Sequence, residues 1–154
     1  MESLTHEVFE LPEWSQFLRV SVRLVIAAAL GGMLGLEREQ WGKPAGLRTH
    51  MLVALGAALF TVAPLEAGMS SEHLSRVIQG IATGVGFLGA GTIVKGSGEQ
   101  GIKGLTTAAG IWLTAAVGIA VGSGLLWIPL VGVILALLIL SGLVWIEGRM
   151  GSKT

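Results

Sequence analysis

Five apolar stretches, each close to the roughly 20 residues that a helix needs to cross a bilayer, dominate this 154-residue chain. They lie near residues 17–36, 49–65, 77–94, 106–121 and 125–146. A chain of this length forms one domain, here 1–154, whose core cannot bury so much apolar surface, so lipid must cover part of it. The sequence therefore predicts an all-α, multi-pass membrane bundle of about five helices. The second and fourth stretches are short, which leaves a re-entrant segment open for either.

Lysine and arginine gather on one side of the predicted spans. The opposite side has an acidic N-terminus and Arg76. Because cytoplasmic loops are enriched in basic residues, we expect the N-terminus outside and the C-terminus in the cytoplasm. The basic residues on the predicted cytoplasmic side are Arg38, Lys43, Arg48, Lys95, Lys103, Arg149 and Lys153.

Glycine is frequent, with 24 residues, and several glycines stand four apart within the spans. Small residues let membrane helices approach closely, so we expect these glycines to pack helix on helix within one bundle. A homodimer face or a ligand groove needs the same residues and stays open as the alternative. The glycines predicted to pack closely are Gly31, Gly35, Gly84, Gly86, Gly89, Gly91, Gly118 and Gly122.

Arg23 lies about seven residues into the first predicted span. An arginine at the centre of a membrane helix costs about 2.5–3.5 kcal/mol in insertion measurements, so it normally faces the protein interior. Two readings remain open. Arg23 either hydrogen-bonds to backbone carbonyls or to Gln79, or it lines a polar pocket that favours an anion or a partner.

The segment 35–50 is the densest polar cluster, with Glu37 and Arg38 at the end of the first span. Thr49 stands where it could cap the second span, and Thr106 or Thr107 could cap the fourth. Two helix N-termini beside Lys43, Arg48 and Lys103 would form a positive site for an anion, a lipid headgroup or an acidic partner surface. Ordinary capping and membrane topology are the plainer explanation of the same residues.

The residues that carry catalysis or metal binding in other proteins are sparse in this chain. There is no cysteine, and His6, His50 and His73 are scattered without an acidic partner at metal or triad spacing. A zero formal charge indicates no nucleic-acid partner. We therefore expect no enzyme, no metal site and no cofactor. For a magnesium or calcium path we would expect several carboxylates in or beside the spans, so a small transporter, if this is one, would suit an anion better than Mg²⁺. A cation path built only from carbonyls stays open.

Two sequence blocks of glycine, charged residues and threonine stand in a fixed order along the chain. The first is Gly35-Leu-Glu-Arg-Glu39 followed by Lys43-Pro-Ala-Gly-Leu-Arg-Thr-His50. The second is Gly84-Val-Gly-Phe-Leu-Gly-Ala-Gly91 followed by Lys103-Gly-Leu-Thr-Thr-Ala-Ala109 and Trp112. These blocks resemble the signature of the MgtC/SapB family, and with Arg23 the resemblance covers about residues 17–124.

The resemblance implies a bacterial inner-membrane protein linked to magnesium limitation, stress adaptation and virulence. Family members act through contacts with other membrane proteins, notably the proton-translocating ATP synthase. Many carry a soluble C-terminal domain, which we do not expect here because the chain stops at Thr154. We thus expect a regulatory membrane protein, with an anion transporter or channel as the alternative. The family motif positions in this chain are Glu37, Arg38, Arg48, Thr49, Gly89, Gly91, Thr106 and Thr107.

Overall fold

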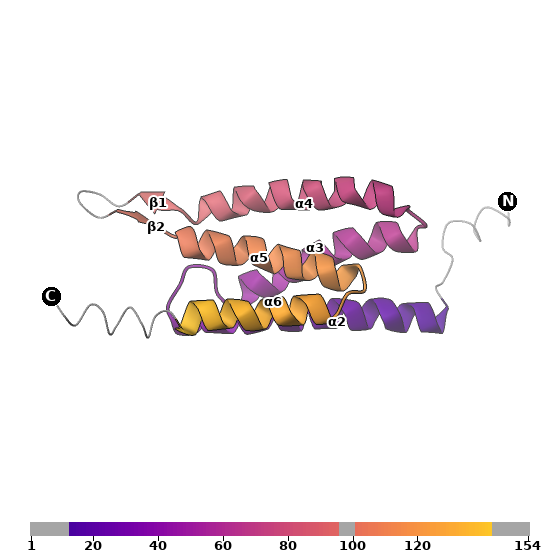
Figure 1. Ribbon diagram of the computed structural model, residues 1–154, viewed down its shortest axis with the longest axis horizontal. Helices are drawn as coiled ribbons and strands as arrows, with labels where there is room; N and C mark the ends of the chain where they lie inside the picture. The colour runs from indigo at the N-terminus through magenta and orange to yellow at the C-terminus, as the bar shows by residue number, and fades with distance from the viewer. Residues whose placement is uncertain (1–12, 96–100, 143–154) are drawn as a thin grey trace, which may run out of the picture.

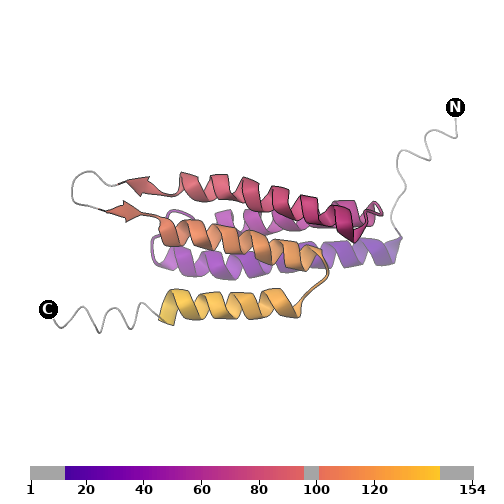
Figure 2. The same cartoon turned by 45° about the horizontal axis from the view of Figure 1, so that its top comes forward.

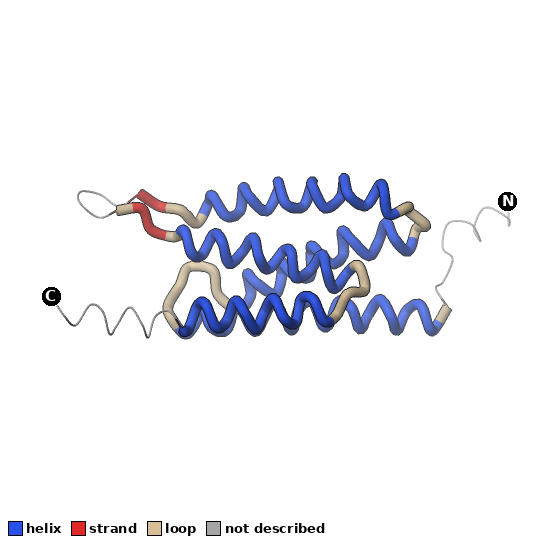
Figure 3. Tube along the Cα trace, viewed as in Figure 1, coloured by secondary structure: helices blue, strands red, loops and turns tan. Residues whose placement is uncertain are grey.

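The computed structural model describes residues 13–95 and 101–142, which fold into five helices and a short β-hairpin (Figure 1). Nearly all of this described chain is helical, as Figure 3 shows. In chain order the elements are α2 (Trp14–Gln40), α3 (Leu47–Glu66), α4 (Ser71–Gly91), β1 (Val94–Lys95), β2 (Ile102–Lys103), α5 (Leu105–Gly122), α6 (Trp127–Leu137) and a π-helical turn η1 (Leu138–Gly142) that continues α6.

The predicted all-α membrane bundle is confirmed. Helices α2, α3 and α5 are each long and apolar enough to cross a membrane. Because α3 and α5 are continuous helices of 20 and 18 residues, neither is a re-entrant segment. The apolar helix formed by α6 and η1 is shorter, and residues 143–146 of the predicted fifth span lie outside the described residues. The helices also extend past the apolar stretches, since α4 begins at Ser71 and α2 continues to Gln40.

The hairpin of β1 and β2 follows α4 and was not predicted. Its strands are antiparallel, with Val94 opposite Lys103 and Lys95 opposite Ile102. Isoleucine and valine favour strands, whereas a two-residue strand is too short to show an alternating pattern. The predicted third span, which ran to residue 94, therefore ends as a helix at Gly91 and continues into β1.

Helices α3 and α5 form the centre of the bundle. Helix α3 packs mainly on α2 and α5, and α5 also contacts α4 and α6. Figure 2 shows α4 and α6 on opposite sides of this centre. One part of the apolar core lies where α2, α5 and α6 meet, around Leu34, Val121 and Val133. The other lies between α3, α4 and α5, around Ile81 and Ile111.

Large apolar side chains cover the outside of the bundle. Phe60 on α3 is 68% exposed, Phe87 on α4 is 82% exposed and Trp127 at the start of α6 is 69% exposed. A soluble protein rarely exposes apolar surface on this scale. The exposed side chains on several helices agree with a protein that a lipid bilayer surrounds.

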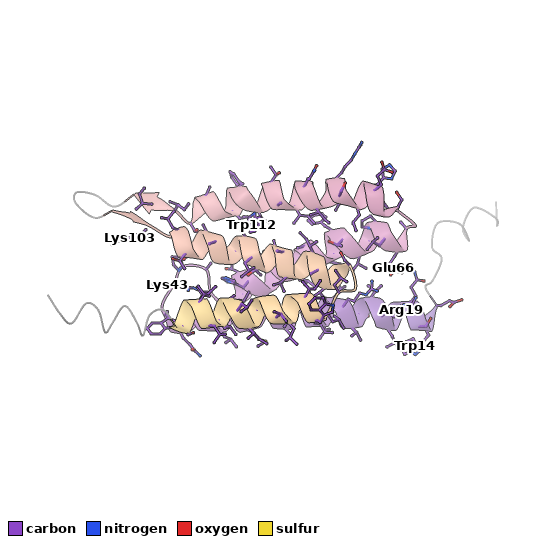
Figure 4. All side chains as sticks on the ribbon, viewed as in Figure 1. Trp14, Arg19, Lys43, Glu66, Lys103 and Trp112 are labelled. Carbon is purple, nitrogen blue, oxygen red and sulfur yellow. The ribbon has the colours of Figure 1, made fainter. Side chains whose placement is uncertain are left out.

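The alternating helices place the loops at two ends. The 41–46 loop and the hairpin lie at one end, which we call the basic end, and the α3–α4 and α5–α6 connections lie at the other (Figure 1). Figure 4 shows Lys43 and Lys103 at the basic end, and Trp14, Arg19 and Glu66 toward the opposite one. The predicted grouping of these two lysines on one side therefore agrees with the fold. Which end faces the cytoplasm stays a prediction.

Candidate functional site

Four of the predicted packing glycines lie where α3 meets its two main neighbours. A Cβ atom added at Gly31 would lie 2.7 Å from the Cβ of Ala54, and one at Gly35 would lie 2.7 Å from the Cα of Leu47. On α5, a Cβ at Gly118 would lie 2.9 Å from the Cβ of Ala57. At Gly122 the nearest atom, the Cβ of Thr61, would be 2.8 Å away. These distances are too short for any side chain, so the glycines bring α2 and α5 close to α3.

The glycines of α4 behave differently, and the prediction for them was largely wrong. A Cβ at Gly84, Gly86 or Gly91 would meet no described atom within 4 Å, and the same holds for Gly80. Gly89 alone is in ordinary contact, 3.5 Å from the Cβ of Ala108. The physical reason is that α4 lies against α5 and only lightly against α3. Apart from Gly89, its glycines therefore do not pack against a second helix.

A groove of about 640 Å³ runs between α3 and α4. Gly56 and Ala57 line it from α3, and Gly80, Ile81 and Gly84 line it from α4. All eleven lining residues are apolar or glycine. Because side chains are missing on both walls, the groove allows another chain to come close to the backbones of α3 and α4.

The helix caps at the basic end differ from the prediction. The N-cap of α3 is Gly46, so Thr49 lies inside the first turn and does not cap the helix. A carboxylate oxygen of Glu39 instead accepts a hydrogen bond from the Leu47 N–H, at 2.8 Å. A carboxylate is favoured at a helix N-terminus because it satisfies a free N–H group and faces the positive end of the helix dipole.

Helix α5 begins after Gly104, which is its N-cap, so the predicted threonine caps are again wrong. Gly104 has a φ of +95°, and a Cβ there would lie 2.9 Å from the carbonyl carbon of Thr92. Only glycine fits this left-handed, crowded position. Thr106 is exposed on the first turn, whereas Thr107 points into the bundle and is 2% exposed.

The predicted positive site is therefore not assembled as expected. Glu39 occupies the N-terminus of α3, where an anion was expected to bind. Lys43, Arg48 and Lys103 are exposed, whereas Arg38 is buried at 4% exposure. The basic side chains thus share one end of the molecule without converging on one pocket.

Arg23 has a structural partner at the opposite end. Its Nη1 donates to the carbonyl of Gly122 at 3.4 Å, at the C-terminus of α5, where a positive charge faces the negative end of the helix dipole. Gly124 has a φ of +84° and leaves room for the guanidinium, because a Cβ would lie 3.0 Å from Nη2. Of the two readings of Arg23, the structure thus agrees with hydrogen bonding to a carbonyl. Gln79 is exposed on α4, which packs on α3 and α5, and it takes no part.

An anion path lined by both Arg23 and the predicted threonine caps would need Arg23 near the start of α5. Arg23 contacts the end of that helix, whereas Thr106 and Thr107 stand at its start. At 1.5 Å per residue, the separation along the helix is roughly 23 Å. The structure does not bring these groups together.

Glu37, Arg38 and His50 form a buried polar cluster at the basic end. They are 8%, 4% and 0% exposed, and the carboxylate lies 3.3 Å from the guanidinium of Arg38. The Nδ1 atom of His50 lies 3.0 Å from the Gly46 carbonyl oxygen. That oxygen can only accept, so Nδ1 carries the proton and Nε2 is a bare acceptor. Arg38 opposes a proton on His50 electrostatically, and Glu37 favours one.

The sequence predicts a polar site with Glu37 and Arg38, but it gives no role to His50, one of three scattered histidines. A signal was present, because His50 is in helical register with Ala54, Ala57 and Thr61, all buried on α3. The capping role of Glu39 had no comparable signal. It depends on the path of the 41–46 loop, which brings Glu39 to a residue eight positions later.

A sequence profile described as the MgtC family matches residues 24–149 of this chain. Protein SrpB of Synechococcus elongatus is 47% identical over 88% of this chain and 80% of its own length. A putative magnesium transporter, YhiD of Escherichia coli, is 44% identical over 77% of this chain and 58% of its own length. Protein MgtC of Brucella abortus is 45% identical over 73% of this chain.

The chain spans only 46% of that Brucella protein, so the matched region is about half of the relative. No solved structure matches this chain. The family match covers most of the sequence, and the fold has three helices that can span a membrane. The chain therefore belongs to the MgtC family and is a membrane protein.

Proposed function

We propose that this chain is a bacterial inner-membrane regulator that acts by direct contact with other membrane proteins. The observation that supports the proposal is the groove between α3 and α4. Three of its glycines, Gly56, Gly80 and Gly84, have no described atom within 4 Å of the position of a Cβ. We expect a transmembrane helix of a partner to lie in this groove, and we expect no catalytic step.

The groove suits a helix for a physical reason. Lipid removes most of the hydrophobic drive for two membrane helices to associate, so close packing and backbone approach become decisive. Gly80 and Gly84 are four residues apart and therefore lie on one face of α4. The glycines within the bundle are already in contact with α3, whereas these two are available for a second molecule.

The link to magnesium in this proposal comes from the names of related proteins. The names of two of them, MgtC and putative magnesium transporter, support a magnesium-related role. We propose that the regulated process belongs to adaptation to magnesium limitation or to stress. By family resemblance, the first partner to test is the proton-translocating ATP synthase.

The test is recovery of the ATP synthase with tagged protein after cross-linking in bacterial membranes and purification in mild detergent. The double variant Gly80→Leu/Gly84→Leu fills the groove, and no described atom obstructs the new Cβ atoms. We expect it to recover about tenfold less partner than the wild type, which corresponds to roughly 1.4 kcal/mol of binding free energy.

The matched control is Gly132→Leu on α6, where a Cβ also meets no described atom. It should leave recovery unchanged, because α6 lies on the other side of the bundle (Figure 2). Equal recovery with the groove-filled and control variants would argue against the groove. Absence of any specific membrane partner of the wild type would argue against the regulatory function itself.

A further inference from the structure

We propose that Glu37 and His50, held beside Arg38, form an internal proton-binding site at the basic end of the bundle. The three side chains come from the last turns of α2 and the first turn of α3. The site is separate from the α3–α4 groove, none of whose lining residues belongs to it. It therefore does not depend on the proposed partner contact.

The first argument is the hydrogen-bond inventory of the cluster. Four buried atoms have no hydrogen-bond partner among the described residues: Oε1 and Oε2 of Glu37, Nε of Arg38 and Nε2 of His50. Three of these are acceptors and one is a donor, since Nδ1 of His50 already donates to the Gly46 carbonyl. Buried polar atoms are normally paired, so the cluster lacks donors. One added proton converts an acceptor into a donor.

The second argument is enclosure. Each of the four atoms is shielded by the surrounding protein, and His50 is completely buried. Nε2 of His50 faces α5 at Gly110, where a Cβ would lie 3.5 Å from it. The backbone of His50 in turn contacts Gly31 of α2. A ligand of several atoms would have to separate these helices, whereas a proton needs no additional space.

The third argument is charge. Glu37 and Arg38 balance each other, so the cluster is neutral while His50 is neutral. Helix α5, which packs against His50, has no titratable side chain between Leu105 and Gly122. In the nearby loop Lys43 is exposed, and Glu39 is bonded to the Leu47 N–H. Within the described residues around the site, the carboxylate of Glu37 is thus the group that can stabilise a proton on His50.

Proton binding would act on the contact between α2 and α3. The cluster would change from zero net charge to +1, and Nε2 of His50 would become a hydrogen-bond donor. The contact at Gly31 and Gly35 is already too tight for a side chain. We therefore expect a change in charge and hydrogen bonding at the cluster to alter the packing of α2 on α3 in a pH-dependent way.

The experiment is NMR of the imidazole nitrogens in the histidine-labelled protein in lipid nanodiscs, between about pH 4 and 8, a range that includes the ordinary titration of histidine. His6 and His73 are assigned by His6→Gln and His73→Gln, so His50 is identified without being changed. We expect one titration step at His50. We also expect Glu37→Gln to weaken proton binding there about tenfold, since it removes the stabilising charge.

Glu72→Gln, at the opposite end beside His73, is the matched control and should leave the His50 step unchanged. Nitrogen signals of His50 that stay constant over the whole range would overturn the proposal, because a buried water would satisfy the same atoms without a titration. A titration step that is the same in wild type and in Glu37→Gln would also overturn it. The first readout, a titration step at His50 in the wild type, does not depend on whether Glu37→Gln folds.

Discussion

Individual residues at the basic end have roles that their neighbours in sequence do not reveal. Glu37, Arg38 and Glu39 are consecutive, yet the first two are buried and the third is exposed. Two of them form a buried ion pair, and Glu39 caps the following helix. A buried ion pair contributes little net stability because desolvation offsets the attraction. Its presence in so small a protein is therefore better explained by a role in function, as we propose for the proton site.

The cap gives a prediction for a single side chain. Glu39→Ala should lower the free energy of unfolding by about 1 kcal/mol, because it frees the Leu47 N–H at the start of α3. The measurement is SDS-induced unfolding in mixed detergent micelles. Glu39→Gln keeps a side-chain oxygen and should lose less. If both variants are as stable as the wild type, Glu39 is not a cap that matters to the fold.

At the scale of elements, glycine has two opposite uses in this protein. On α2 and α5 it removes side chains that would clash with α3, whereas on α4 it leaves an open face. The same spacing of four residues produces both. The difference arises because α3 packs against both α2 and α5, whereas α4 contacts the bundle mainly at α5.

This difference predicts opposite signs for the same substitution. Gly118→Ala should destabilise the bundle by about 1–3 kcal/mol, because the new methyl group meets Ala57 and the backbone of Ala54. Gly86→Ala on α4 should be neutral or stabilising by up to about 1 kcal/mol, because alanine is the better helix former. Both are measured by the same unfolding assay, and similar losses in the two variants would contradict the distinction.

On the scale of the whole molecule, the alternation of helices places the described loops at two ends. The basic residues of the 41–46 loop and of the hairpin thus lie together at one end (Figure 4). The positive-inside rule predicts that this end faces the cytoplasm. The fold is compatible with either orientation, since the packing of the helices is the same whichever end faces the cytoplasm.

Single cysteines can test the orientation, because the chain contains none. Lys43→Cys in the 41–46 loop should react with a membrane-impermeant maleimide in inverted inner-membrane vesicles and not in spheroplasts. Met69→Cys, in the exposed α3–α4 connection, should show the reverse pattern. Labelling of Met69→Cys from the cytoplasmic side would mean that the predicted orientation is inverted.

The sequence by itself determined the number and order of the helices, the membrane environment and the family. These follow from long apolar stretches and contiguous motifs, both of which are local properties of the chain. It also located Glu37, Arg38 and the glycines of α2 and α5, because each lies in a local motif.

Only the tertiary structure decided which glycines pack against a neighbouring helix, which residue caps α3 and what surrounds His50. Glu39 bonds a residue beyond the loop, and Arg23 bonds a carbonyl almost a hundred positions later. Such partners depend on how helices cross, and a spacing of four residues is the same on a packed face and on an open one. The buried cluster exists because α2, α3 and α5 meet at one place, which no local pattern in the chain records.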